Sequence, residues 1–526
     1  MLYLLAMEKL VLDGCSLDLE SLAQVARSRR SAVLDPDAVR RMDASRSVVD
    51  RCVREKLVRY GITTGFGKFC DVAITGSENV LLQKNLIMSH ACGQGAPLSR
   101  EVVRSMMLLR ANALAVGNSG IRPSTVRTLL AMLEADLVPV VPEKGSLGAS
   151  GDLAPLAHMV LPMIGLGEAY LRGERMSGAD AMNAAGITPV VLEAKEGLAL
   201  INGTQAMTAV GSLATIDALN LLKTADLVAA LSLQALRGIR DAFDPRLHDL
   251  RRQPGQIACA ARMRRLLEDS ALVTGQGELR VQDPYVLRCI PQVHGASADA
   301  IGYVRSTVEH ELNAVTDNPL IFPSPADGTS ELGDIISGGN FHGQPVALAM
   351  DFLAIACAEL ANISERRLER LVNPTLSNGL PAFLTSSGGL NSGFMIVQYS
   401  AASLVSENKV LAHPASVDSI PSSANQEDHV SMGTIAARKA ASIIGNVQSV
   451  LAMELTAACQ ALDLRAAQMG GIPAIELLSP TTREAYLLLR SAVPPLSGDR
   501  VMYPDLDAAR ILVADGSIAQ CITEPA

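Results

Sequence analysis

The tripeptide Ala149-Ser150-Gly151 has the residue types needed to turn a stretch of backbone into an electrophile. Glycine has no Cβ, so the Gly151 nitrogen can approach the carbonyl carbon of Ala149, and the small alanine side chain does not obstruct it. Ser150 carries a β-hydroxyl that can leave as water. Cyclisation with loss of two waters would give a five-membered ring with an exocyclic methylene, an electrophile that no ordinary side chain supplies. A helix that begins after Gly151 would direct the positive end of its dipole at this ring.

Ala-Ser-Gly is also a common tripeptide, and a glycine-rich turn without chemistry is the alternative interpretation. Other familiar motifs are missing from the sequence. The string that begins at His310 lacks the second histidine of a zinc-binding HExxH motif, because Ala314 stands there. Gly165-Leu-Gly167 lacks the third glycine of a dinucleotide fingerprint, no GxxxxGK[ST] phosphate loop occurs, and Ser150 is not in a GxSxG elbow. The sequence therefore predicts no metal and no external cofactor, so difficult chemistry must come from the chain itself.

The surroundings of the tripeptide resemble a known family. The run GSLGASGDLAPLAHM, residues 145–159, is similar to the signature of the ammonia-lyases and aminomutases that use a 4-methylidene-imidazole-5-one (MIO) group. Seven further blocks resemble the same family, in family order: YGITTGFGKF (60–69), NLIMSHACGQG (85–95), EGLALINGTQ (196–205), QDPYVLRCIPQVHG (282–295), ELNAVTDNP (311–319), GGNFHGQP (338–345) and NQEDHVSMG (425–433).

This resemblance implies that ammonia is eliminated from an α-amino acid, a carbon–nitrogen lyase reaction. Its electrophile would be an MIO group formed autocatalytically from Ala149, Ser150 and Gly151. The β-proton of the substrate is barely acidic, so the reaction also needs a placed base. Tyr60 matches the family's catalytic tyrosine and is expected to be that base; its alternative role is a buried tyrosine with a satisfied hydroxyl. A free phenol has a pKa of about 10, so the site must tune it.

The resemblance also implies a set of substrate contacts. Arg288 matches the residue that grips the substrate carboxylate, a task suited to a planar two-pronged donor. Tyr285 is expected to line the same wall and to assist proton transfer. Asn202, Gln282 and Phe341 match positions around the electrophile or the substrate. For these three the alternative is a structural hydrogen bond or a packing role.

Two residues bear on the choice of substrate. The Ser89-His90 pair resembles the pair that histidine-specific members of the family have at this position. Members that act on phenylalanine or tyrosine typically have other residues there. His90 can hydrogen-bond another imidazole, and a phenyl-binding pocket would leave it unpaired. Glu427 can accept the ring N–H of a histidine substrate or receive a proton as the amine departs. L-histidine is therefore the expected substrate, with trans-urocanate as the product, in the first step of histidine degradation.

Alternatives to this function stay open. Tyrosine aminomutases can also carry Ser-His, so a tyrosine or phenylalanine lyase or aminomutase with the same electrophile is the alternative enzyme. A catalytically inactive helical scaffold is the non-enzyme alternative, against which the intact blocks around Tyr60, Ser150 and Arg288 argue. One residue departs from the family pattern: Gln205 follows Asn-Gly-Thr where many relatives have a small residue, and nothing in the sequence accounts for its effect.

Long helices are expected to position these residues. Apolar residues recur with helical spacing over Thr208–Leu236, Gln344–Leu371 and Val430–Leu464, and each segment is longer than an average globular helix. They predict a mainly α fold with a long central helical bundle. Residues 1–207 would form a smaller N-terminal part with the MIO loop, and residues 208–526 the bundle, together one lyase unit. The resemblance implies a homotetramer with shared active sites.

Composition and charge exclude several classes of partner. The 526 residues carry 45 basic and 54 acidic side chains, a net charge of −9 that disfavours nucleic acid and anionic membranes. Nine widely spaced cysteines without a CxxC pair argue against a disulfide framework and predict a reducing compartment, the cytoplasm. No uninterrupted apolar run has the length of a membrane span, and the apolar start Met1–Met7 lacks the basic region and cleavage site of a signal peptide.

Overall fold

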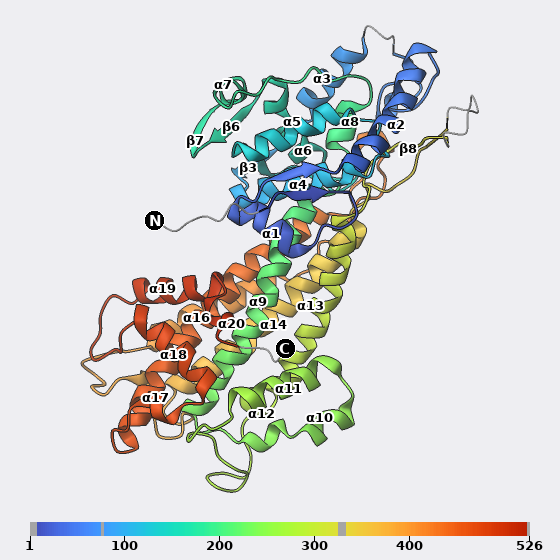
Figure 1. Ribbon diagram of the computed structural model, residues 1–526. Helices are drawn as coiled ribbons and strands as arrows, with labels where there is room; N and C mark the ends of the chain where they lie inside the picture. The colour runs from blue at the N-terminus through green and yellow to red at the C-terminus, as the bar shows by residue number, and fades with distance from the viewer. Residues whose placement is uncertain (1–7, 75–77, 325–332, 523–526) are drawn as a thin grey trace. The chain divides into compact units, whose positions relative to one another are not determined.

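The computed structural model of the chain describes residues 8–74, 78–324 and 333–522 (Figure 1). The apolar start Met1–Met7 lies outside the described residues. Long helices and a few strands of three or four residues make up the described chain, so the predicted mainly α fold is confirmed. The chain folds into two compact units. Unit 1 comprises Met1–Leu213, Ser306–Met350 and Pro414–Arg438, and unit 2 comprises Ala214–Arg305, Asp351–His413 and Lys439–Ala526.

The first segment of unit 1 ends at Leu213, close to the predicted division after residue 207. Two later segments, residues 306–350 and 414–438, also belong to unit 1, and no feature of the sequence signalled their return. They carry Phe341 and Glu427. Two residues predicted for the site from distant parts of the sequence therefore belong to the same compact unit as the tripeptide loop.

Helix α4 (Arg100–Ala115) lies in the core of unit 1. Each of its residues from Val103 to Ala115 is buried, and the Ser99 hydroxyl caps the helix by accepting the Val102 N–H. Helix α4 packs against α1 (Leu19–Ser28) and α5 (Pro123–Glu134). The remaining short and medium helices of unit 1 are α2 (Pro36–Arg54), η1 (Gly67–Phe69), α3 (Asn79–His90), α6 (Leu153–Val160), η2 (Leu161–Ile164), α7 (Gly178–Ala184), α8 (Glu196–Ile201) and η5 (Ser423–Asn425).

Small sheets connect the helices of unit 1. The described strands are β1 (Leu10–Leu12), β2 (Ala32–Leu34), β3 (Gln94–Pro97), β4 (Leu137–Pro139), β5 (Pro142–Lys144), β6 (Glu168–Leu171), β7 (Glu174–Ser177), β8 (Leu320–Phe322) and β9 (Asp334–Ile336). Strands β1 and β2 pair in parallel, whereas β3–β5, β4–β6–β7 and β8–β9 are antiparallel. Strand β5 ends at Lys144, so its pairing with β3 fixes the chain just before the tripeptide loop. Helices α3, α6 and α8 pack against one another. Helix α3 precedes the tripeptide loop in the sequence, and α6 and α8 follow it.

Four long helices of the described chain each begin in one unit and end in the other: α9 (Gln205–Ala235), α13 (Ile290–Leu312), α14 (Gln344–Val372) and α16 (Gly433–Gln468). Three of them confirm the helices predicted from apolar periodicity, with ends within a few residues. Helix α13 was not predicted. Its sequence contains Pro291, Gly295 and Gly302, residues that weaken intrinsic helix preference, so burial of its apolar face must supply the stability.

In unit 2 a fully buried ion pair joins three of these helices. Arg367 of α14 forms two hydrogen bonds with Glu454 of α16, at 2.6 and 2.9 Å. The hydroxyls of Ser232 on α9 and Ser364 on α14 each donate to the same carboxylate at 2.6 Å. The other helices of unit 2 are η3 (Arg240–Phe243), α10 (Pro245–Arg251), α11 (Pro254–Leu266), α12 (Tyr285–Arg288), η4 (Ala382–Leu384), α15 (Met395–Leu411), α17 (Ala474–Leu477), α18 (Pro480–Ala492), α19 (Tyr503–Ala514) and α20 (Ser517–Gln520).

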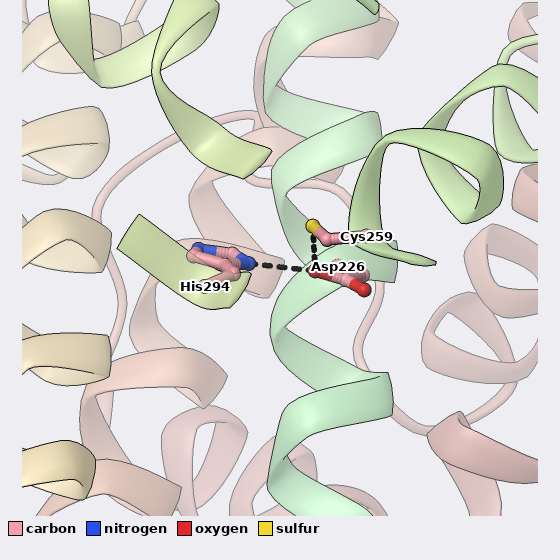
Figure 2. Close-up of side chains that lie close together, drawn as sticks. All are labelled: Asp226, Cys259 and His294. Atoms are coloured by element: carbon pink, nitrogen blue, oxygen red, sulfur yellow. Dashed lines mark hydrogen bonds and ion pairs between the residues drawn. The ribbon is translucent and has the colours of Figure 1, made fainter. Parts of the chain in front are cut away.

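Figure 2 shows a second buried cluster of unit 2, in which Asp226 of α9 receives hydrogen bonds from Cys259 and His294. The Cys259 Sγ and His294 Nδ1 atoms lie 3.2 and 2.7 Å from Asp226 Oδ1, close enough for the three side chains to share a metal ion. Arg262 binds the other oxygen of Asp226 at 2.7 Å, and the Arg367 guanidinium faces His294 Nε2 at 3.3 Å.

These neighbours determine which nitrogen of His294 carries the proton. A guanidinium can only donate, so His294 Nε2 must accept and Nδ1 must hold the hydrogen that goes to Asp226. Burial lowers the pKa of His294 and favours this neutral form. Burial also raises the pKa of the Cys259 thiol well above its usual value, so the thiol stays protonated. We therefore interpret the cluster as a core hydrogen-bond network, because the atoms that would bind a metal are engaged with one another.

Helices α14 and α16 are long and apolar enough to cross a membrane by length and composition alone. Their most apolar windows are 67% and 72% buried inside the protein, and core helices of globular proteins commonly have this character. Neither helix is an uninterrupted apolar run, because Asp351 and Glu359 interrupt α14 and Glu454 interrupts α16. The composition of these two helices is therefore weak support for a membrane span.

Candidate active site

Unit 1 contains a concave cavity of about 1320 Å³ that opens beside the tripeptide loop. Residues from six separated stretches of sequence line it, including seven that the sequence predicted for the site: Tyr60, His90, Ala149, Ser150, Asn202, Phe341 and Glu427. A space of this size has more than enough room for a small-molecule substrate. The structure thus brings together most of the predicted residues around Ser150.

Close contact with a second backbone segment holds the tripeptide. Gly151 has a φ of +73° and forms a parallel bridge with Gly203. A Cβ at position 151 would overlap the backbone of Gly203, so only glycine fits there. Ala149 is buried against Val430 and Met432. The tripeptide is therefore packed against Gly203, Val430 and Met432 and is not an exposed glycine-rich turn.

Asp152 is the residue immediately before α6, a position from which a carboxylate can cap a helix. Its carboxylate nevertheless makes no capping bond to α6. The carboxylate instead accepts the Ser146 hydroxyl at 2.7 Å, the Met207 backbone N–H at 2.8 Å and the Thr434 hydroxyl. Burial raises the pKa of Asp152, while these bonds act in the opposite direction. Asp152 thereby ties the loop before the tripeptide to the starts of α9 and α16.

Polar contacts position both ends of Ser150. Its hydroxyl donates to Glu427 Oε1 at 2.8 Å, and its carbonyl oxygen accepts from Asn202 Nδ2 at 2.8 Å. The other carboxylate oxygen of Glu427 accepts the Ser422 hydroxyl at 3.1 Å. Two backbone hydrogen bonds between Ser422 and Glu427 also close this loop. Glu427 thus lies within hydrogen-bonding reach of the residue that the sequence identified as the source of the electrophile.

Tyr60 lines the cavity with its hydroxyl directed toward the η1 turn. The hydroxyl accepts the Gly67 N–H at 3.4 Å. Burial raises the pKa of the Tyr60 phenol, the Gly67 bond lowers it, and the nearby Cys70 and Glu427 raise it further. Within one chain the phenol is therefore the favoured form at neutral pH, and a base at this position needs positive charge brought close to it.

His90 ends α3 with its ring facing the cavity. Its Nδ1 lies 2.8 Å from the Leu86 carbonyl oxygen, which can only accept, so Nδ1 carries a proton. Burial lowers the pKa of His90 and favours the neutral ring. A neutral ring protonated at Nδ1 has a free acceptor at Nε2. His90 can therefore receive a hydrogen bond from an N–H group of a bound molecule.

Four predicted residues do not line this cavity: Gly151, which lies behind it against Gly203, and three residues of unit 2. Gln282, Tyr285 and Arg288 belong to unit 2, where Tyr285 and Arg288 are the first and last residues of α12. The Arg288 guanidinium stacks over the Tyr285 ring at 4.7 Å, and that ring is 71% exposed. The Arg288 Nε atom is buried without a hydrogen-bond partner among the described residues. Their predicted roles stay predictions.

A family model described as aromatic amino acid lyase matches residues 17–491, which is most of the chain. The chain belongs to the aromatic amino acid lyase family. It is also 59% identical to the protein named histidine ammonia-lyase from Alkaliphilus oremlandii, over 516 residues that cover 98% of this chain and 99% of that protein.

Solved structures of aromatic amino acid lyases have the same fold. A histidine ammonia-lyase from Trypanosoma cruzi is 42% identical, with a TM-score of 0.89 and coverage of 98% of this chain and 95% of that chain. A tyrosine aminomutase from Streptomyces globisporus is 36% identical, with a TM-score of 0.91 and 98% coverage of both chains. The helical fold predicted from the sequence is therefore that of this enzyme family.

Some residues of the lyase cavity were not predicted. His342 and His429 stack in its wall with ring centroids 5.6 Å apart. Gly203 and Ser422 support the tripeptide and Glu427 from outside the cavity. His342 and His429 stand within two of the blocks that carry the family resemblance, and that was the available signal. Nothing in the sequence marks Ser422 as a partner of Glu427.

Proposed function

We propose that this aromatic amino acid lyase eliminates ammonia from L-histidine and releases trans-urocanate, the first step of histidine degradation. The observation that carries the proposal is the presence of His90, Glu427 and Ser150 around one cavity. A neutral His90 offers an acceptor and Glu427 offers a carboxylate, and both suit the N–H groups of an imidazole. An apolar ring would give neither of these half-buried groups a further hydrogen bond. The 59% identity to a protein named histidine ammonia-lyase supports the same substrate.

The residues around the tripeptide fit an MIO group formed from Ala149, Ser150 and Gly151. Gly151 has no room for a Cβ, which matches a backbone that must close on itself. The Ser150 carbonyl, which becomes the ring carbonyl, accepts a hydrogen bond from Asn202. Such a group supplies an electrophile that makes the substrate amine a better leaving group and the β-proton more acidic. Asn202 would hold the group through that carbonyl, and Glu427 lies next to the Ser150 side chain.

The chain's own residues orient the substrate and move protons. We expect His90 and Glu427 to hold the imidazole, so that the β-carbon faces Tyr60. Tyr60 then takes the β-proton as general base, and Glu427 can receive a proton as ammonia leaves. The fold around Tyr60 favours the protonated phenol, so its function requires a cation close to the hydroxyl. Arg288 is our candidate for that cation and for binding the substrate carboxylate.

We also propose that the enzyme is a homotetramer in which neighbouring chains complete each site. Arg288 and Tyr285 do not line the cavity of unit 1, while Tyr285 is exposed and the Arg288 Nε atom has no hydrogen-bond partner in the described part of the chain. Unit 2 has further exposed large side chains on long helices, namely Tyr303 on α13, Phe352 and Ile355 on α14, and Ile396 and Tyr399 on α15. Such apolar surface is typical of subunit interfaces.

Hybrid enzymes test the shared site. Tyr60→Phe and Arg288→Ala chains are each expected to be nearly inactive. When the two are co-expressed and assemble at random, about one quarter of sites should combine an intact Tyr60 with an intact Arg288 from a neighbouring chain. Turnover well above that of either variant alone would support sharing. An additive mixture, or a fully active monomer by light scattering, would contradict it.

Substrate choice is tested at His90 and Glu427. His90→Leu and Glu427→Gln should each lower kcat/KM for L-histidine by about 10- to 100-fold, because each removes one hydrogen bond to a buried imidazole. His158→Gln is the matched control, since His158 is a partly buried histidine of α6 outside the cavity lining. Steady-state kinetics with L-histidine and L-tyrosine decide the outcome. Unchanged histidine kinetics in both variants would rule out their proposed role.

A tyrosine lyase or aminomutase is the second candidate. The TM-score of 0.91 to a tyrosine aminomutase favours it, whereas the lower identity of 36% does not. It would share the electrophile and Tyr60 and differ in the ring that the cavity accepts. Appearance of a β-amino acid from tyrosine, without urocanate from histidine, would select it.

We place the reaction in the cytoplasm. All nine cysteines lie in the described part of the chain and are free thiols, which suits a reducing compartment. The acidic net charge of −9 suits a small-molecule enzyme without nucleic-acid or membrane partners.

A further inference from the structure

A buried polar cluster lies directly behind the segment that supports the tripeptide. Its centre is Arg110 of α4, which is completely buried. Arg110 Nη1 donates to the Asn202 carbonyl at 3.1 Å, to Gln205 Oε1 at 2.8 Å and to the Thr316 carbonyl at 3.2 Å. Its Nε and Nη2 atoms both donate to the carbonyl of Ala199 in α8. One guanidinium thus binds the end of α8, the start of α9 and the segment after α13.

Gln205, whose effect the sequence did not explain, completes this cluster. Its amide oxygen accepts from Arg110, and its amide nitrogen donates to the Thr316 hydroxyl at 2.7 Å. Both ends of the buried amide are therefore satisfied, and its orientation is fixed. A small residue at position 205 would leave one Arg110 N–H and the Thr316 hydroxyl without these partners. Gln205 thus supplies a side-chain acceptor for Arg110 Nη1.

Gly203 lies between this cluster and the tripeptide. A Cβ at Gly203 would overlap Arg110 Nη1, Gln205 Oε1 and the Thr316 carbonyl oxygen, so the cluster packs directly against one side of the glycine. On its other side Gly203 forms the parallel bridge to Gly151, and its carbonyl accepts the Asp152 N–H at 2.7 Å. Any movement of the guanidinium is therefore transmitted directly to the backbone that contacts Gly151.

The Asn202–Gly203 segment holds the peptide groups on both sides of the Gly151 residue. Asn202 Nδ2 binds the carbonyl of Ser150, which belongs to the same peptide group as the Gly151 nitrogen. The Gly203 carbonyl binds the N–H of Asp152, in the following peptide group. The position of the Gly151 nitrogen relative to the Ala149 carbonyl carbon is consequently set from the side of Arg110.

We propose that Arg110, Gln205 and Thr316 form a positioning cluster for closure of the MIO ring, acting through Asn202 and Gly203. This inference rests on the proposed function. In the closure, the Gly151 nitrogen bonds to the Ala149 carbonyl carbon. That carbonyl oxygen leaves as water with the hydrogens of the Gly151 and Ser150 nitrogens, as a C=N bond forms. The Ser150 hydroxyl leaves as a second water with the Ser150 Cα hydrogen, as the exocyclic C=C bond forms. No oxidant or reductant is needed.

Arginine suits this position better than lysine. Its planar fork has five N–H donors in fixed directions, and here they reach four carbonyl or amide oxygens on three segments. A lysine has one nitrogen and cannot bind the same set. Because ring closure is intramolecular, its rate depends steeply on the placement of the attacking nitrogen, and displacement by about 1 Å can cost about 100-fold.

The test measures dehydration of the tripeptide directly in purified protein. Trypsin releases the peptide of residues 145–172, and its mass reports how many waters have been lost from Ala149–Gly151. In freshly purified Gln205→Ala and Arg110→Lys, the fraction that has lost two waters should fall at least about fivefold. The kcat per mole of chain should fall in the same proportion, while KM stays near the wild-type value. Gln205→Glu keeps the acceptor for Arg110 and should restore most of the dehydration.

Matched controls separate positioning from general loss of stability. Arg104→Lys alters a second buried arginine of α4, which binds the carbonyls of Val25 and Leu133. Gln234→Ala alters a second buried glutamine of α9, which lies in unit 2. Both controls should lose thermal stability and still show complete dehydration.

Complete dehydration and wild-type kcat in folded Gln205→Ala and Arg110→Lys would overturn the inference. If Arg110→Lys does not fold, the contrast between Gln205→Ala and Gln205→Glu decides it alone. A wild-type peptide that has lost no water would instead refute the proposed function, so the two failures are distinguishable.

Discussion

Ser150→Ala is expected to lower kcat for L-histidine by at least about 10⁴-fold, which corresponds to about 5.5 kcal/mol of barrier. Without the β-hydroxyl, the second water cannot be lost and no exocyclic methylene can form. Ordinary side chains in the cavity cannot replace that electrophile, so the general base and the substrate contacts are left with an unactivated amine. The measurement is the rise in absorbance of the conjugated product, followed at saturating L-histidine.

The same variant should fold normally. Before ring closure the Ser150 hydroxyl donates a hydrogen bond to Glu427, and loss of such a bond near a cavity costs only about 1 kcal/mol. Circular dichroism and the thermal midpoint should therefore match those of Ser105→Ala, a control that removes a buried hydroxyl of α4 bonded to the Glu101 carbonyl. A Ser150→Ala enzyme with more than a few per cent of wild-type turnover would contradict the proposed electrophile.

Tyr60→Phe is expected to lower kcat by about 10²- to 10⁴-fold with little change in KM, because the general base is lost while the cavity keeps its shape. The pH profile carries a second signature. The base is the deprotonated form, and burial raises the pKa of Tyr60, so the active fraction grows as the pH rises toward that pKa. Wild-type kcat/KM should therefore increase through the alkaline range.

The Tyr60→Phe profile should lack that increase. Tyr170→Phe serves as the control, because Tyr170 lies on β6 outside the lining of the catalytic cavity. Its activity and pH profile should match the wild type. If Tyr60→Phe kept half of the wild-type kcat and the same alkaline rise, another group would have to be the base.

Local sequence patterns predicted the parts of this protein that depend on neighbouring residues. Apolar periodicity predicted three long helices, and a helix was also expected to begin after Gly151. Helix α13 was not predicted, because its proline and glycines lower the intrinsic helix preference of the segment and its stability comes from tertiary packing. Asp152 shows the same limit, since its carboxylate binds Met207 and Thr434 and not its own helix.

The site itself was predictable to the extent that its residues stand in recognisable blocks. Seven predicted residues line one cavity, although they are separated by as many as several hundred positions in the sequence. The Arg110–Gln205–Thr316 cluster was not predictable, because it depends on contacts between residues about one hundred to two hundred positions apart. Gln205 could be singled out as unusual, but its partner could not. The positions of Gln282 and Arg288 relative to the substrate depend on assembly, which one chain does not specify.

We propose that the chain deaminates histidine, and this is tested most directly by offering the purified enzyme L-histidine, L-tyrosine and L-phenylalanine in parallel. Absorbance of the conjugated acrylate product is followed in each reaction. We predict a rapid rise with L-histidine and turnover of the other two at least about 100-fold slower, as expected for a cavity with polar groups matched to imidazole. A rise with L-tyrosine and none with L-histidine would contradict the claim.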